Sequence, residues 1–282
     1  MNRNSLLTTT LGAVLCVASL NTVAKDLLTQ IKERKEIVIA TEAAYKPYEY
    51  IENGKIVGYD KDLLDFVMEG LPGVKVTQVD VPWASVLPGL AVKKFDFVVT
   101  VVGITRERYD NFALTYPIGD GTVALLKRAS DDKLSTPEDI SGRIVGAQVG
   151  SSQLRALQKY NTKLISDGKP GVEEIKEYAA FDEAYADLAA GRTAAVAQSI
   201  SSLAGVVKER PDIFAIMTPT IGPKAYFSWV GRKDADSKPL VDFFNERIAL
   251  ANSSGKMKAL QMKWFGFEMP VPTSVPEPLE ID

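Results

Sequence analysis

The feature that most constrains the fold is a repeated alternation between short β-branched apolar runs and segments with helical periodicity. The first round of this alternation predicts a strand at residues 36–42, a helix at 60–71, a strand at 74–81, a helix at 83–94 and a strand at 95–102. Strands that alternate with helices form parallel, doubly wound sheets, so the chain is predicted to have an α/β fold. Asp60 is the predicted N-cap of the first helix, and Asn53-Gly54 predicts a hairpin turn.

The same alternation begins again in the middle of the chain. It predicts a strand at 121–128, a strand at 144–148, a helix at 154–160, a helix at 183–190 and a strand at 194–198. The run at 225–233 is predicted to be a strand that returns the chain to the first unit, and two helices follow it. We therefore predict two doubly wound sheets joined by two crossing strands, with lobe 1 formed by residues 25–122 and 228–282 and lobe 2 inserted at 123–227.

Residues 1–24 are predicted to be a signal peptide. The apolar stretch at 6–20 is too short to span a bilayer, and Thr22-Val23-Ala24 supplies the small residues that precede a cleavage site. The alternative is a lipoprotein anchored at Cys16, but the bulky Leu15 stands where a small residue is expected. We expect cleavage near Ala24 and export to the periplasm.

Composition excludes several classes of function. Cys16 is the only cysteine, and the sequence contains no histidine, which excludes Ser-His and Cys-His nucleophile pairs and argues against catalytic zinc. Removal of residues 1–24 takes only Arg3, so the formal net charge changes from −3 to −4. This mildly acidic balance gives no indication of nucleic-acid binding. We expect no metal and no cofactor.

The stretch "DFVVTVVGITRERYDNFALTYP" carries the strongest indication of function. A buried strand ends at Gly103, and Arg108 follows within one short turn. Ligands in open α/β sheets bind outside the carboxyl ends of strands, so we expect Arg108 to face the gap between the two sheets. A guanidinium group can hold a carboxylate through two parallel hydrogen bonds. The alternative interpretation is that residues 106–108 begin a solvated helix.

The sequence resembles the family 3 periplasmic solute-binding proteins of polar amino acid ABC importers. The resemblance extends from about residue 36 to 267, and its motifs are "YKPYEYIENGKIVGYDKDLL", "WASVLPGLAVKKFDFVVTVVGITRERYDNFALTYP", "SGRIVGAQVGSSQ", "AYADLAAGRTAAVAQ" and "MKWFGF". It implies a two-lobed, type II-like periplasmic binding protein fold. It also implies a monomeric receptor that closes on a small carboxylate ligand and delivers it to an ABC permease in the inner membrane.

The resemblance also implies a set of ligand-binding residues. Arg108 matches the arginine that holds the ligand carboxylate in the Thr-x-x-Arg segment, in which Thr105 is the threonine, and Gly103 lies just before that segment. The other matching positions are Tyr45 and Trp83, which cover the ligand, Ser151 and Ser152, which complete the carboxylate site, and Glu42, which contacts the ligand side chain or amine. Core packing is the alternative role for the two aromatic residues, and a solvated strand end is the alternative for Glu42.

Two departures from the family pattern concern the ligand. Ser199, preceded by Gln198, stands where the family has an aspartate that pairs with the ligand ammonium, and a neutral serine cannot supply that charge. Gly103 lacks the hydroxyl group that is common at its position. We therefore expect either an amino-acid derivative with a substituted amine, as in opines, or an amine that lies near Glu42.

Two other classes of function remain open from the sequence. The same fold resembles that of periplasmic cyclohexadienyl dehydratases, in which case Glu42 would be the only evident general acid. A sensor that acts through another protein is the second alternative. A lone carboxylate without a visible partner is weak support for catalysis, so we predict a binding protein and not an enzyme.

Overall fold

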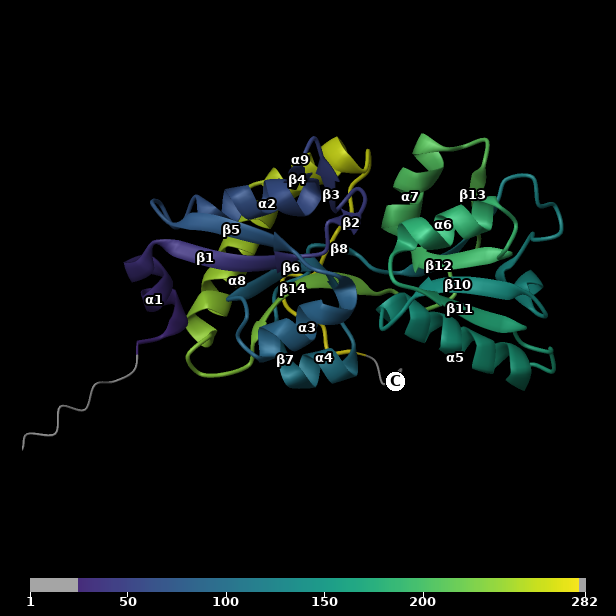
Figure 1. The fold of residues 1–282 in the computed structure, drawn as a ribbon, viewed down its shortest axis with the longest axis horizontal. Coiled ribbons are helices and arrows are strands. Elements are labelled where there is room, and N and C mark those ends of the chain that lie inside the picture. The colour runs from purple at the N-terminus through teal and green to yellow at the C-terminus, as the bar shows by residue number, and fades with distance from the viewer. Residues whose placement is uncertain (1–24, 279–282) are drawn as a thin grey trace, which may run out of the picture.

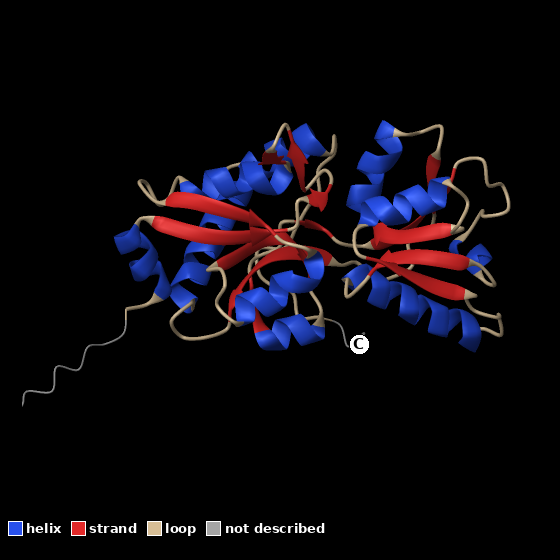
Figure 2. Cartoon of the chain, viewed as in Figure 1, coloured by secondary structure: helices blue, strands red, loops and turns tan. Residues whose placement is uncertain are grey.

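The computed structural model describes residues 25–278, so the predicted signal peptide and the last four residues lie outside the described part (Figure 1). These residues form two lobes that lie side by side, and Figure 2 shows helices on both faces of the strands in each lobe. We call the part around the six-stranded sheet the first lobe and the part around the five-stranded sheet the second lobe. No helix within residues 25–278 is both long and apolar enough to cross a membrane.

The first lobe contains a mixed sheet with the strand order β5-β1-β6-β14-β7, and β8 also pairs with β14. Its strands are β1 (Glu36–Thr41), β5 (Lys75–Asp80), β6 (Phe97–Gly103), β7 (Phe112–Leu114), β8 (Gly119–Asp120) and β14 (Tyr226–Arg232). A small sheet of β2 (Ala44–Tyr45), β3 (Glu49–Glu52) and β4 (Lys55–Val57) lies beside it. The helices are α1 (Leu27–Arg34), α2 (Tyr59–Met68), α3 (Trp83–Ala91), α4 (Arg106–Asn111), α8 (Lys238–Ser253) and α9 (Lys256–Trp264).

The second lobe contains a sheet with the strand order β11-β10-β12-β9-β13. Its strands are β9 (Val123–Arg128), β10 (Ile144–Gln148), β11 (Glu174–Tyr178), β12 (Ala195–Ser199) and β13 (Phe214–Met217). Its helices are α5 (Ser152–Ser166), α6 (Phe181–Ala189) and α7 (Ile200–Glu209), with a 3-10 turn at Pro137–Ile140. Thr136 and Asp139 form the capping box that begins this turn.

The parallel pairing predicted from the alternation is present in part of each sheet. Strand β1 lies parallel to β5 and β6, and β10 lies parallel to β11 and β12. The strands that enter each sheet from the other lobe, β14 and β9, run antiparallel to their neighbours. Both sheets are therefore mixed, because β9 and β14 begin at the connections between the lobes, close to where the parallel strands β6 and β10 end.

The prediction that Asp60 caps α2 is wrong. Gly58 is the N-cap, Asp60 is the second residue of the helix, and its side chain is fully buried. Gly58 has φ 132°, and a Cβ atom there would lie 2.2 Å from the carbonyl oxygen of Tyr48. This close approach turns the start of α2 inward, so the Asp60 carboxyl group is directed into the core and not toward the first amides of the helix.

Strand β6 is buried at every position, and it delivers the chain to the junction between the lobes. Phe97 at its start stacks on Phe244 of α8 with ring centroids 4.0 Å apart. Both faces of β6 are buried, which explains why its sequence is an almost continuous run of apolar residues. The rigid strand therefore fixes the position of Gly103 and of the short helix α4 that follows.

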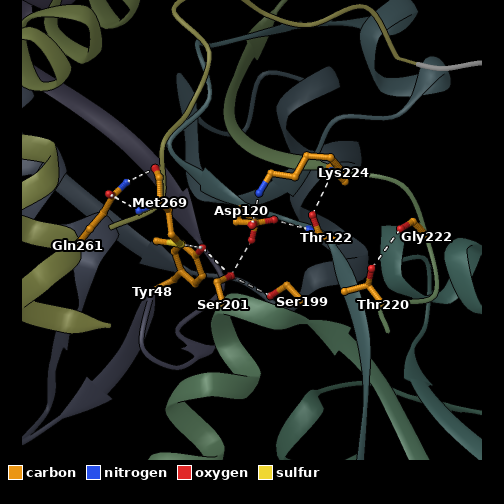
Figure 3. Close-up of polar contacts among 11 residues, drawn as sticks. Tyr48, Asp120, Thr122, Ser199, Ser201, Thr220, Gly222, Lys224, Gln261 and Met269 are labelled. Carbon is orange, nitrogen blue, oxygen red and sulfur yellow. Dashed lines mark hydrogen bonds and ion pairs between the residues drawn. The ribbon is translucent and has the colours of Figure 1, made fainter. Parts of the chain in front are cut away.

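Two short connections join the lobes, at residues 121–122 and 218–225. They are hydrogen-bonded to each other, since Gly121 N donates to Ala225 O at 2.9 Å and Ala225 N donates to Thr122 Oγ1 at 3.2 Å. Lys224 also pairs with Asp120 (Figure 3). Most residues of the predicted strands at 121–128 and 225–233 belong to β9 and β14, which are strands of the sheets that the connections enter.

Candidate functional site

Arg108 lies at the junction of the lobes because of how β6 ends. Thr105 is the N-cap of α4, and its hydroxyl group accepts a hydrogen bond from Arg108 N at 3.3 Å. The short helix turns the Arg108 side chain inward, where only 4% of the residue is exposed. The solvated-helix interpretation therefore fits the exposed Glu107 but not Arg108.

The Arg108 guanidinium group contacts both lobes. Its Nη1 donates to Gly103 O at 3.0 Å, and its Nη2 donates to Gly150 O, in the turn between β10 and α5, also at 3.0 Å. The group lies over the Trp83 ring, 5.0 Å from its centroid, which is a cation–π geometry. Two peptide carbonyls thus occupy the positions in which a carboxylate could accept the same two hydrogen bonds.

A small cavity lies between Arg108 and the second lobe, and most of the predicted site residues line it. The lining residues are Glu42, Tyr45, Trp83, Val101, Arg108, Gln148, Ser151, Ser152 and Gln153. Its volume is about 10 Å³, close to the minimum that holds one water molecule. An amino acid is far larger, so a ligand can enter only when the lobes separate.

Glu42 follows β1 directly and is only 5% exposed, so it is not a solvated strand end. Its carboxylate accepts a hydrogen bond from Gln148 Nε2, and the same amide group donates to Ala179 O at 3.0 Å. Burial raises the pKa of Glu42 to about 7, although the hydrogen bond from Gln148 acts in the opposite direction. Glu42 is therefore an acid whose charge depends on its surroundings near neutral pH.

Tyr45 combines the two roles that the sequence leaves open. Its ring packs edge-on against Phe181, with centroids 5.4 Å apart, so it is a core residue. Its hydroxyl group donates to Gln198 Oε1 at 2.5 Å and accepts from Gln153 Nε2 at 2.7 Å, so it is also part of the site. Because Gln153 and Gln198 belong to the second lobe, these hydrogen bonds join the lobes directly.

The two serines of the second lobe occupy the start of α5. Ser151 is the N-cap, and its Oγ accepts a hydrogen bond from Leu154 N at 3.0 Å. Ser152 is the first helical residue and faces Gly103 so closely that a Cβ atom on the glycine would lie 2.2 Å from Ser152 Oγ. The absence of a side chain at Gly103 therefore allows the lobes to approach as closely as they do.

Three predicted residues do not line the cavity. Gly103 contributes its carbonyl to Arg108, and Thr105 positions Arg108 through its cap. Ser199 is the buried N-cap of α7, and its Oγ also lies 3.0 Å from Ser202 Oγ and 3.3 Å from Ser201 Oγ. Its hydroxyl group is thus engaged within the second lobe.

Sequence reasoning missed three glutamines at this site: Gln148, Gln153 and Gln198. Gln148 and Gln198 lie at the carboxyl ends of β10 and β12, where ligands of open α/β sheets bind. This position at the ends of strands could have identified Gln148 and Gln198. The sequence gives no other indication of a ligand-binding role for an uncharged amide. Within residues 25–278 there is no group of acidic residues, histidines or cysteines that could hold a metal ion.

Residues 37–267 match the family of bacterial extracellular solute-binding proteins, family 3. The chain belongs to this family. It is 26% identical to the L-cystine-binding protein TcyJ of Escherichia coli strain K12 over 87% of this chain and 88% of that protein. It is 28% identical to the octopine-binding periplasmic protein of Rhizobium meliloti over 72% of each chain.

A solved structure of an arginine-binding protein has the same fold as this chain. A mutant of ArgBP from T. maritima is 27% identical, with a TM-score of 0.73 over 85% of this chain and 99% of that one. The two-lobed fold of family 3 binding proteins is therefore that of this chain. The family and its named relatives are binding proteins and not enzymes, which supports a solute-binding role over the dehydratase alternative.

Proposed function

We propose that this protein is the periplasmic solute-binding component of an ABC importer that captures an amino acid or an amino-acid derivative by its carboxylate. One observation carries the proposal: a buried cation, Arg108, and a buried acid, Glu42, line one cavity between two lobes. Those are the complementary charges for a carboxylate and an ammonium group. The relatives that bind cystine and octopine support this class of ligand.

The carboxylate end of the ligand is assigned to Arg108. The two hydrogen bonds that now go to Gly103 O and Gly150 O would be redirected to the carboxylate, which is a stronger acceptor. Ser152 adds a hydroxyl group, and the first amides of the fifteen-residue helix α5 face the same region. A ligand held in this way touches both lobes and therefore favours their closed arrangement.

The amine end is assigned to Glu42. Ser199, at the position where the family has an aspartate, is neutral and caps α7, whereas Glu42 lines the cavity. An ammonium group beside Glu42 would favour the ionised carboxylate and replace the hydrogen bond from Gln148. The same cavity would then hold both charged ends of an α-amino acid.

An N-substituted, opine-like ligand is the second candidate. The three glutamines of the site can donate hydrogen bonds to a second carboxylate, and β12 ends in the neutral Gln198-Ser199. A relative that is named as octopine-binding supports this class of ligand. The two candidates differ in whether a free primary amine is needed.

Delivery would depend on movement and not on chemistry. The lobes would open and close about residues 121–122 and 218–225, and the ligand-loaded form of the monomer would dock on an inner-membrane permease. A ligand shifts this equilibrium only by its difference in affinity for the two forms. No covalent step is required of any residue.

Calorimetric titration tests the proposal. Arginine, cystine and other free amino acids would be compared with their N-carboxyalkyl derivatives and with their carboxamides, which lack the carboxylate. We expect one of the first two groups to bind and the matching carboxamide to fail. Equal binding of a ligand and its carboxamide would contradict the role of Arg108. Binding of derivatives alone would select the opine-like candidate over the free amino acid.

A further inference from the structure

The start of α7 in the second lobe is hydrogen-bonded to the first lobe through Ser201, which is fully buried. Ser201 Oγ accepts a hydrogen bond from Tyr48 Oη at 2.9 Å and donates to Asp120 O at 2.6 Å (Figure 3). Tyr48 belongs to the turn between β2 and β3, and Asp120 ends β8, which leads into the connection at residues 121–122. These hydrogen bonds therefore join the lobes beside the place where the chain crosses between them.

The ring of Tyr48 is held in place by the core of the first lobe. It is fully buried and packs edge-on against Tyr59 and Phe265, with ring centroids 5.7 Å and 4.8 Å away. Gly119 leaves space for the hydroxyl group, because a Cβ atom there would lie 2.6 Å from Tyr48 Oη. The hydroxyl group is thus presented at a fixed point of the first lobe, and its hydrogen bond to Ser201 depends on the position of the second lobe.

Ser201 is held in place by the start of α7. Ser199 is the N-cap of this helix, and its Oγ lies 3.3 Å from Ser201 Oγ. Ile200 N donates to Thr122 O at 2.8 Å, so the backbone fixes the start of α7 to the connection. The hydroxyl group of Tyr48 adds a second attachment, which reaches from the core of the first lobe.

The hydrogen bond between Tyr48 and Ser201 differs from the other contacts between the lobes, because neither residue lines the small cavity of the candidate site. Arg108 and Tyr45 also contact the second lobe, but both of them line that cavity, so a ligand would compete with their contacts. A solute in the cavity has no need to displace the hydrogen bond between Tyr48 and Ser201. This bond can therefore act in the same direction as a bound solute.

We propose that Tyr48 and Ser201 form a latch that stabilises the closed arrangement of the lobes, whether or not a solute is bound. Tyr48 moves with the core of the first lobe and Ser201 with α7, so separation of the lobes breaks the hydrogen bond between them. A buried hydrogen bond of this kind favours the closed arrangement by roughly 2- to 12-fold. By raising the closed population, the latch increases the apparent affinity for any solute that binds the closed form.

Tyr48→Phe removes the hydroxyl group and keeps the ring. Ser201 still donates to Asp120 O in this variant, so its hydroxyl proton keeps an acceptor. The matched control is Tyr59→Phe, because Tyr59 is also fully buried and its hydroxyl group donates to Ile118 O, within the first lobe, at 2.7 Å. Both variants lose one buried hydrogen bond, so both should unfold at a slightly lower temperature. The first variant alone loses a contact between the lobes.

Distance measurements between two spin labels test the latch. With Cys16→Ser the chain contains no cysteine, so Lys55→Cys and Glu183→Cys place one label at an exposed position of each lobe. Without added solute, the ratio of closed to open molecules should be roughly 2- to 12-fold lower in Tyr48→Phe than in the labelled parent and unchanged in Tyr59→Phe.

Three results would overturn the latch: an unchanged ratio in Tyr48→Phe, an equal fall in both variants, or no measurable closed population in the labelled parent. Because the measurement needs no ligand, its outcome is independent of the proposed transport function.

Discussion

The hydroxyl group of Tyr45 in the first lobe donates a 2.5 Å hydrogen bond to Oε1 of Gln198 in the second. This contact and those of Arg108 and Gln148 join the lobes through the same polar groups that line the candidate site. A ligand must therefore compete with contacts that the protein makes with itself.

Arg108→Ala should abolish measurable binding. The variant loses the two proposed charge-assisted hydrogen bonds to the ligand carboxylate. Each is worth ~1.5–3 kcal/mol, so the loss corresponds to roughly 10²–10⁴-fold in Kd. Arg108→Lys keeps the charge but loses the forked geometry, so its binding should lie between those of the wild type and Arg108→Ala. Calorimetry measures both variants, and thermal unfolding should show that Arg108→Ala remains folded. Normal binding by Arg108→Ala would exclude the assigned site.

The affinity for an amino acid with a free amine should fall as the pH falls below about 7. Burial raises the pKa of Glu42 to about 7, so the carboxylate becomes protonated below that pH and no longer pairs with an ammonium group. The loss approaches tenfold per pH unit. Titrations between pH 5.5 and 8.5 measure it, and Glu42→Gln should remove the dependence. A wild-type affinity that is constant over this range would place the amine elsewhere.

Gly103→Ala should weaken ligand binding by keeping the lobes apart. The added Cβ atom would lie 2.2 Å from Ser152 Oγ, and overpacking of this kind costs about 1–3 kcal/mol, or roughly 5- to 150-fold in Kd. Ser152→Gly removes the opposing atoms, so the double variant should recover part of the affinity. Gly222→Ala is a matched control, because a Cβ atom there meets nothing within 4 Å. Failure of the second substitution to compensate would show that the loss of affinity does not come from the contact with Ser152.

The stability of the fold should decrease as the pH rises from about 5 to 8. Glu49 and Asp60 are both fully buried in the first lobe, and burial raises the pKa of each carboxyl group above its ordinary value. The folded chain therefore retains protons that the unfolded chain releases above about pH 4, so the stabilisation is greatest at low pH and is lost as the pH rises.

Urea unfolding at several pH values measures this effect, which reaches at most about 1.4 kcal/mol per pH unit for each proton. Glu49→Gln should make the dependence shallower, because it removes one of the two buried carboxyl groups, the one whose pKa is raised by burial and by the neighbouring Asp60. The matched control is Asp65→Asn, which removes an exposed carboxylate from α2, the helix that contains Asp60. A slope that is the same for Glu49→Gln and the wild type would show that this pair does not control the pH response.

The strands and the inward position of Arg108 could be predicted because local patterns determine them. The apolar run that forms β6 marks a buried strand, and strands of this kind end where ligands bind. The inward position of Asp60 could not be predicted, because it depends on the contact between Gly58 and the Tyr48 backbone. The antiparallel direction of β14 likewise depends on the route of the chain through the other lobe.

The candidate site likewise contains residues that the sequence could predict and residues that it could not. Charged and aromatic residues stand out in the sequence, and Arg108, Glu42, Tyr45 and Trp83 come together as expected. The glutamines do not stand out, because an amide at a strand end is common in any fold. The engagement of Ser199 at the start of α7 is a property of three-dimensional packing that its position in a motif does not reveal.

The two peptide carbonyls held by Arg108 have a consequence for selectivity. In the proposed binding mode, a ligand carboxylate would replace the Gly103 and Gly150 carbonyls as acceptors of the two hydrogen bonds from Arg108. With the proposed carboxylate site at Arg108, affinity would depend on the advantage of a full negative charge over two neutral carbonyl dipoles, so an uncharged analogue would gain little by displacing them. Under this proposal, two backbone carbonyls would provide the discrimination against uncharged solutes.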